Sequence, residues 1–252
     1  MSIKFNNYLG RNNNLEIVDR KGVFTVYKHN EDMSVHPGDA QLKYFMREMD
    51  VCQKHMLIQL NNNKCILNPG AMKMMSGGIQ MTSGVAGAGD LLKKGFKSAV
   101  TGNAPIKPEY SGSGYIITEP TYNHIILENL ADWNGSVVLD DGIFIACEGT
   151  IKDNVIRRQN LSSTVAGGEG FFNLKLDGHG IFAINSKYQK DELLEVVLEN
   201  DVFKIDGPDA IMWSSTLDFT VERSGKSLLG SAASGEGLVN VYRGTGRILI
   251  AH

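Results

Sequence analysis

Histidine and the acidic residues are the side chains of this chain that could bind a metal or transfer protons. The six histidines are His29, His36, His55, His124, His179 and His252. A mononuclear metal site needs ligands that converge, which β-rich enzymes often supply as HxH with a downstream carboxylate and metalloproteases as HExxH. Neither spacing occurs in the sequence. The histidines therefore predict scattered surface or rim positions, with no metal and no other cofactor.

Two glutamates, Glu169 and Glu236, each lie between two glycines at equivalent places in the sequence. A pair of carboxylates can serve as general acid and base. The alternative is structural, because a glutamate in a tight glycine turn can accept backbone N–H bonds. The structural interpretation is favoured, since the corresponding residue of an earlier copy is Ser113. Ser111 and Ser234 lack the GxSxG context of a nucleophile elbow, so we expect no enzymatic activity.

A glycine-rich segment between Ser83 and Tyr110 contains the candidate contact surface. Its centre has apolar residues at i, i+4 and i+8 with lysines on the other side, which predicts a short amphipathic helix. Asp90 can cap the start of this helix and Gly102 can close its end. The helix either packs over an exposed part of the fold or contacts a protein partner or a membrane surface. The candidate contact residues are Leu92, Lys93, Lys94, Phe96, Lys97 and Val100.

The elements that must position these residues are strands. Short apolar runs predict strands at residues 22–27, 55–60, 122–127, 193–198 and 217–221. Clusters of Asn, Asp and Gly predict hairpin turns at residues 61–63, 132–135 and 200–201. Trp133, in the second cluster, is expected at the surface, and Trp213, in a strand, is expected in the core. Residues 41–49 form either one or two helical turns or an extended run.

A glycine pattern occurs three times, each time before an apolar strand. The clearest copies begin at Gly168 and Gly235, and a weaker first copy begins at Gly112. The second and third copies keep the same spacing to an upstream turn, whereas the first copy carries the glycine-rich insert. We interpret the repeated glycines as structural turn residues. They are Gly112, Gly114, Gly168, Gly170, Gly178, Gly180, Gly235, Gly237, Gly244 and Gly246.

Length and composition predict a globular, all-β protein. The chain has 252 residues, of which 42% are hydrophobic and 21% charged, with 28 glycines and 6 prolines. Such values are typical of a folded chain with many tight turns. The repeats divide residues 51–252 into three units, at about 51–120, 121–187 and 188–252. We expect the N-terminal extension, residues 1–50, to pack on this core.

The order of these motifs resembles the mitochondrial-biogenesis "altered inheritance of mitochondria" family and its bacterial homologues, built on the fold of the trp RNA-binding attenuation protein (TRAP-like). The resemblance runs from about Val51 to Ile250. It is carried by residues 234–239 with 244–246, by residues 167–172, and by the end of the insert at 97–102. It implies three β-sandwich units in a pseudo-threefold arrangement. It also implies no enzymatic activity, and the mitochondrial members are associated with inner-membrane organisation.

Charge and cysteine content limit the partners and the compartment. With 25 basic and 28 acidic residues the formal net charge is −3, which disfavours nucleic acid as a partner. The three cysteines, Cys52, Cys65 and Cys147, are odd in number and form no CxxC motif, which favours a reducing compartment. Residues 1–14 lack the apolar run of a signal peptide, so we expect a cytoplasmic protein.

Together these features predict a non-enzymatic β-rich scaffold or interaction protein. We expect it to contact a protein partner or a membrane through residues 87–102, and to form homo-oligomers through sheet edges or barrel ends. One alternative is single-stranded RNA binding, by analogy with the attenuation protein, for which Arg157, Arg158, Arg243 and Arg247 are the available basic residues. Another alternative is binding of a small ligand in a pocket at the rim of a sandwich.

Overall fold

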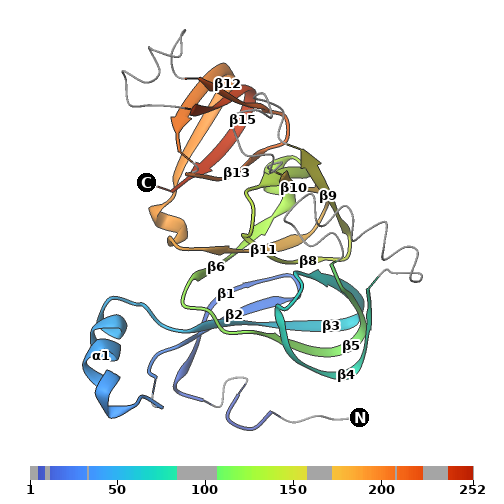
Figure 1. Cartoon of the computed structure of the whole chain (residues 1–252). Helices are drawn as coiled ribbons and strands as arrows, with labels where there is room; N and C mark the ends of the chain where they lie inside the picture. The colour runs from blue at the N-terminus through green and yellow to red at the C-terminus, as the bar shows by residue number, and fades with distance from the viewer. Residues whose placement is uncertain are drawn as a thin grey trace.

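The computed structural model of the chain describes residues 5–8, 12–32, 34–83, 107–157, 172–207, 209–223 and 238–251 (Figure 1). Its strands form two antiparallel sheets, one of eight strands and one of seven. The all-β class predicted from the sequence is confirmed. The predicted amphipathic helix, with its six contact residues between Leu92 and Val100, lies outside the described residues.

The N-terminal extension forms a hairpin and a helical segment. Its elements are β1 (Leu15–Lys21), β2 (Phe24–His29), the 3-10 turn η1 (Pro37–Asp39) and α1 (Ala40–Glu48). The segment 41–49, for which the sequence allowed a helix or an extended run, is therefore helical. In Figure 1 α1 stands out to one side of the β structure. Among helices of the described residues, none is long and apolar enough to cross a bilayer.

Three units of the same topology follow the extension. Unit 1 consists of β3 (Lys54–Leu67), β4 (Met72–Thr82) and β5 (Glu109–Thr118). Unit 2 consists of β6 (His124–Asn129), η2 (Leu130–Trp133), β7 (Ser136–Leu139), β8 (Phe144–Glu148), β9 (Ile151–Arg157), β10 (Phe172–Gly178) and β11 (Ile181–Ser186). Unit 3 consists of η3 (Lys190–Glu192), β12 (Leu194–Asp206), β13 (Ala210–Ser214), β14 (Asp218–Arg223) and β15 (Leu238–Ile250).

The three units share one hydrogen-bonding plan. In unit 1, β5 lies between β3 and β4, and in unit 3, β15 lies between β12 and the pair β13 and β14. Unit 2 repeats this plan with each long strand broken into two. A β-bulge occurs at the same place in each unit, where Lys73, Ile145 and Ile211 are the extra residues. The threefold repeat is thus structural, but the strand registers align Gly112 with Gly178 and Gly244, whereas the sequence pattern had aligned it with Gly168 and Gly235.

Short antiparallel strand pairs, here called joints, connect unit 2 to both of its neighbours. The first joint pairs the end of β3 with β8, and the second pairs β7 with β13. The Asn68 N–H donates to the Ile145 carbonyl at 2.7 Å in the first joint, and the Asp140 N–H donates to the Ile211 carbonyl at 2.9 Å in the second. The two joints therefore share one register. Among the described residues, no strand of unit 1 pairs with a strand of unit 3.

The extension continues the sheet of unit 1. β2 pairs with β3 from Phe24 opposite Ile58 to Lys28 opposite Lys54. Glu148 of unit 2 holds the turn between β1 and β2, because its carboxylate accepts the Val23 N–H at 3.2 Å. The apolar faces of these strands pack into clusters in which most side chains are fully buried.

Trp133 is buried, so the prediction that it lies at the surface was wrong. Only 2% of the residue is exposed. The left-handed conformation of Asn134 folds the chain back after η2, and the indole then lies under the guanidinium group of Arg247, 4.0 Å from the ring centroid. Arg247 belongs to unit 3, so this contact was invisible in the local sequence. Trp213 lies in the core as predicted, also 2% exposed.

The repeated glycines serve close strand approach more than turns. Gly112 and Gly114 lie inside β5, and Gly244 and Gly246 lie inside β15, whereas Gly178 and Gly180 flank the turn between β10 and β11. Gly112 has φ +124°, and a Cβ there would lie 2.2 Å from the Gly78 carbonyl oxygen of β4. The other predicted turn glycines, Gly168, Gly170, Gly235 and Gly237, lie outside the described residues.

Two of the three predicted asparagine turns are bulges inside long strands. Asn62 (φ +56°) lies within β3 and Asn200 (φ +53°) lies within β12. The Asn62 N–H donates to Ser113 Oγ and the Asn200 N–H to Thr245 Oγ1, each at 2.9 Å. These hydroxyls sit between the paired glycines of the neighbouring strand. Asparagine tolerates the left-handed conformation that a turn and a bulge both require, which explains why the local prediction of a hairpin was wrong.

Candidate functional site

α1 presents an exposed apolar face. It follows the 3-10 turn at Pro37, and none of its residues is buried. Leu42 and Phe45 lie on one side of the helix at i and i+3, and Met49, the residue directly after its last turn, follows at i+7; they are 63%, 55% and 78% exposed. The Tyr44 ring meets the Phe45 ring edge-on at 5.5 Å. The side chains of Leu42, Phe45 and Met49 are called the α1 apolar face below.

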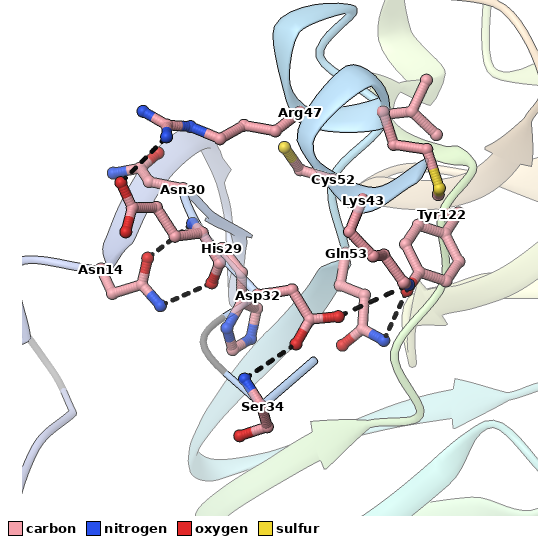
Figure 2. A pocket seen from close by; sticks show the side chains of 13 residues that line it. Asn14, His29, Asn30, Asp32, Ser34, Lys43, Arg47, Cys52, Gln53 and Tyr122 are labelled. Carbon is pink, nitrogen blue, oxygen red and sulfur yellow. Dashed lines mark hydrogen bonds and ion pairs between the residues drawn. The ribbon is translucent and has the colours of Figure 1, made fainter. Parts of the chain in front are cut away.

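The other side of α1 borders a pocket of about 320 Å³ (Figure 2). Its walls come from α1, from the segment that follows β2, from the residues just before β3, and from Tyr122. The pocket thus lies where the N-terminal extension meets the three-unit core. The polar side chains that line it are Asn14, His29, Asn30, Glu31, Asp32, Ser34, Lys43, Arg47, Gln53 and Tyr122.

Both cations of α1 are paired with acids across this pocket. Lys43 Nζ lies 3.4 Å from Asp32 Oδ2 and also hydrogen-bonds the Tyr122 hydroxyl, over whose ring it lies. Arg47 Nη1 lies 3.1 Å from Glu31 Oε1. Pairs this exposed contribute about 0–1 kcal/mol each. Their main effect is to fix which side of the helix faces the core, which leaves the α1 apolar face outward.

A cluster of rings, of which Tyr27 and His55 are buried, adjoins the pocket at His29. The His29 and His55 ring centroids are 5.2 Å apart, His55 stacks on Tyr27 at 5.7 Å, and His55 Nε2 shares a hydrogen bond with the Tyr8 hydroxyl. Burial is the main cause that lowers the pKa of His55 to about 4, and the neighbouring His29 and Lys73 act in the same direction. Burial also lowers the pKa of His29. Both imidazoles are therefore neutral at pH 7 and act here as packed aromatic rings.

The described residues do not assemble a metal centre. Within ranges 5–83 and 107–251, gaps excepted, no three His, Cys, Asp or Glu side chains converge as ligands. Ser111 lies in β5. Glu169, Glu236 and Ser234 lie outside the described residues. The chemistry that the site offers is apolar contact and paired charge.

The three cysteines are free and buried. Burial, with Glu109 nearby, raises the pKa of Cys65 to about 12, and burial also raises the pKa of Cys147. Because the thiolate is the reactive form, we expect both thiols in the folded protein to react with Ellman's reagent at least about a hundredfold more slowly than in urea. Mass spectrometry of the labelled peptides would measure this. Fast labelling of Cys147 without denaturant would contradict its burial.

The structure thus presents an exposed apolar surface that the sequence did not single out. The i, i+3, i+7 spacing of Leu42, Phe45 and Met49 was present in the sequence, but for residues 41–49 the sequence allowed both helical turns and an extended run. Two of the basic residues proposed to bind RNA form ion pairs within the chain. Arg243 Nη2 lies 2.6 Å from Glu222 Oε1, and Arg247 Nη1 lies 3.0 Å from Glu195 Oε1. The side chain of Arg157 and all of Arg158 lie outside the described part.

Comparison with known proteins decides the family. The model of the mitochondrial biogenesis AIM24 family matches residues 50–251. The chain belongs to this family. The AIM24 match spans β3 to β15 and begins directly after α1, so α1 and the β1–β2 hairpin lie outside the matched residues, while the pocket is lined from both sides of that boundary. The TRAP-like relationship stays a prediction.

Two relatives from Streptococcus pyogenes extend the AIM24 comparison. An uncharacterised protein of serotype M6 is 30% identical over 113 residues, which are 44% of this chain and 44% of the relative. The aligned part thus spans less than half the length of that curated relative. A crystal structure of another S. pyogenes protein superposes with a TM-score of 0.58 at 23% identity, over 80% of this chain and 88% of that chain. This second likeness concerns the fold alone.

Proposed function

We propose that this AIM24-family protein is a non-enzymatic β scaffold that binds a protein partner through the α1 apolar face. One observation carries the proposal: Leu42, Phe45 and Met49 are more than half exposed on a single side of the helix. An amphipathic helix with anchors at i, i+3 and i+7 is a common way to fill an apolar groove of a partner. The paired cations on its other side hold the helix in place for that contact.

Charge favours a protein groove over a lipid surface as the partner. Helices that lie on membranes use free lysine and arginine to attract anionic headgroups. Lys43 and Arg47 are each already paired with an acid, Asp32 and Glu31. Asp39 and Glu48, in α1 or at its start, add further negative charge. The surroundings of the apolar face therefore repel anionic lipid.

Other features support the scaffold over its alternatives. Single-stranded RNA binding has less support, because Arg243 and Arg247 are each held by a carboxylate. A small polar ligand in the pocket would have to compete with the ion pairs that already cross it. Three free thiols support a reducing compartment such as the cytoplasm. The absence of enzymatic activity is part of the proposal.

Photo-crosslinking in the native host tests the proposal. With p-benzoylphenylalanine in place of Phe45, irradiation is expected to join the full chain to one discrete protein. Adding Leu42→Glu or Met49→Glu is expected to reduce that adduct at least about tenfold, since anchors at the centre of an interface dominate affinity. The matched control places the label at Val197, which is 66% exposed on β12, and is expected to leave that protein unlabelled.

Flotation with vesicles separates the remaining outcomes. The full chain is expected to stay in the soluble fraction with vesicles of phosphatidylcholine and phosphatidylglycerol. Flotation that Met49→Glu abolishes would replace the protein partner with a membrane. An adduct that survives both glutamate variants would overturn the role of the α1 apolar face.

A further inference from the structure

Two long strands have an edge that pairs with no other described strand. β4 pairs with β5 and β12 pairs with β15, and neither pairs with a second strand in the part of the chain that the structure describes. Their counterparts in the joints, β8 and β7, have partners on both sides. The two open edges lie at opposite ends of the molecule, with β12 at the top of Figure 1 and β4 at the bottom.

The open edge of β12 is the third copy of a surface that forms both joints. The residues of the three units can be aligned on a Gly-x-Gly pair that each unit contains. These pairs are Gly112 and Gly114 in β5, Gly178 and Gly180 between β10 and β11, and Gly244 and Gly246 in β15. Cys65, Val137 and Phe203 each lie opposite the residue two positions before the first glycine of that pair. Cys65 and Val137 are the residues with which β3 and β7 pair across the joints. Residues 203–206 of β12 therefore correspond to joint residues 65–68 and 137–140.

The open edge of β4 corresponds to the edges of β8 and β13, the strands that form the other side of the two joints. Met75, Cys147 and Trp213 each lie opposite the residue two positions after the second glycine. Cys147 and Trp213 are buried in the joints, whereas Met75 and its neighbour Met74 are each 45% exposed. Two adjacent exposed methionines on a strand edge are unexpected for a free surface. They occupy positions that are covered wherever a joint forms.

We propose that β12 of one copy of this chain pairs with β4 of a second copy, antiparallel and in the register of the two internal joints. That register places Phe203 opposite Ser76, Lys204 opposite Met75, Ile205 opposite Met74, and Asp206 opposite Lys73. Ile205 then meets Met74, Met75 meets the aliphatic part of Lys204, and Phe203 lies opposite the small side chain of Ser76. The outermost pair brings together opposite charges, which stabilises a cross-strand contact.

The pairing is head to tail and does not depend on the α1 apolar face. Each copy uses two different edges, so every copy added leaves one edge of each kind open. Such a heterologous contact makes a ring when its rotation closes and a longer array when it does not. The sheet continues from copy to copy by the same strand geometry that continues it from unit to unit.

A mixed-disulfide experiment on the full chain tests the register. In the first joint the Lys64 carbonyl accepts the Gly149 N–H, and the Asn68 N–H donates to the Ile145 carbonyl. Hydrogen-bonded and non-hydrogen-bonded pairs alternate between Lys64 and Asn68, so Leu67 lies in a non-hydrogen-bonded pair. Ile205 corresponds to Leu67, and its proposed pair with Met74 is therefore also non-hydrogen-bonded. Such pairs bring Cα atoms close enough for a disulfide. Met74→Cys protein mixed with Ile205→Cys protein is expected to give a crosslinked dimer under mild oxidation. The matched control replaces Met81, also exposed on β4, and is expected to give none.

A charge exchange tests the same contact without touching the apolar face. Lys73→Glu and Asp206→Lys each place like charges opposite one another, and each is expected to weaken self-association about fivefold. The double variant restores opposite charges and is expected to regain the affinity, as measured by sedimentation. Both residues are exposed, and the Lys73 ammonium also lies 3.5 Å from Glu119 in the same chain, so the unfolding of each variant is measured alongside its association. A mainly Ile205→Cys homodimer, no mixed disulfide at high protein concentration, or no recovery in the double variant would overturn the proposal.

Discussion

Replacing Gly112 with alanine is expected to destabilise the protein by about 3 kcal/mol or more. Two effects add at this position. The φ of +124° is unfavourable for any residue with a Cβ, and the new Cβ would lie 2.2 Å from the Gly78 carbonyl oxygen and 3.4 Å from the Ile79 Cα. Both neighbours are backbone atoms of β4, so they cannot move aside as a flexible side chain would. Urea unfolding followed by far-ultraviolet circular dichroism measures the loss.

Gly70 supplies the matched control for Gly112. It also has a positive φ, +80°, but nothing lies within 4 Å of a Cβ built there. Gly70→Ala is therefore expected to lose only the conformational part, about 1 kcal/mol. If the two alanine variants unfold at the same urea concentration, the close approach of β4 and β5 at Gly112 contributes nothing.

Acid is expected to weaken the fold through His55 by about 3 kcal/mol between pH 7 and pH 4. Burial holds its pKa at about 4 in the folded chain, against 6.5 as the ordinary value. Between those two values the unfolded chain carries a proton at His55 that the folded chain lacks, so stability falls as pH falls. The loss begins below about pH 6.5 and is complete near pH 4.

The variant His55→Gln isolates this contribution. Glutamine can still bond the Tyr8 hydroxyl but does not titrate in this range. His29 and His124, whose pKa values burial also lowers, are present in both proteins, so the comparison isolates His55 together with its interaction with His29. Thermal or urea unfolding at several pH values is expected to show a difference between the two proteins that grows as pH falls. Parallel curves would mean that His55 is solvated in the folded state.

Much of the β structure could be predicted from short apolar runs. The runs at 22–27, 55–60, 122–127, 193–198 and 217–221 each overlap an observed strand. These predictions succeed because a short apolar run indicates a buried strand without reference to distant residues: four or more consecutive residues are buried in β2, β3 and β6. The repeats were also visible, because the glycines that permit close strand approach recur at fixed positions.

The direction of the chain after a polar cluster could not be predicted locally. Asn62 and Asn200 have the composition of a hairpin turn, yet β3 and β12 continue through them. What decides between a turn and a bulge is the neighbouring strand, whose Ser113 and Thr245 hydroxyls accept the asparagine N–H groups. That partner lies 45 or more residues away in the sequence. The prediction that Trp133 is exposed was wrong for a similar reason, because the Arg247 side chain that covers its ring belongs to a distant part of the sequence.

The α1 apolar face illustrates a different limit of sequence-based prediction. The pattern of Leu42, Phe45 and Met49 fits a helix, but periodicity alone predicts a face that is covered by the core. Only the ion pairs of Lys43 and Arg47 with the segment after β2 show that the covered side is the polar one. Tertiary contacts therefore decide whether an apolar stripe of a helix faces the core or the solvent.

The two joints affect the order in which parts of the protein unfold. Each unit is stabilised by its own strands and by its nearest neighbours, as in a short one-dimensional lattice. Unit 2 has two joints, unit 1 has one joint and the β1–β2 hairpin, and unit 3 has one joint. Local opening is then easiest at the carboxyl-terminal unit and hardest at the centre. We therefore expect unit 3 to open locally before the whole molecule unfolds, as terminal repeats do in solenoid proteins.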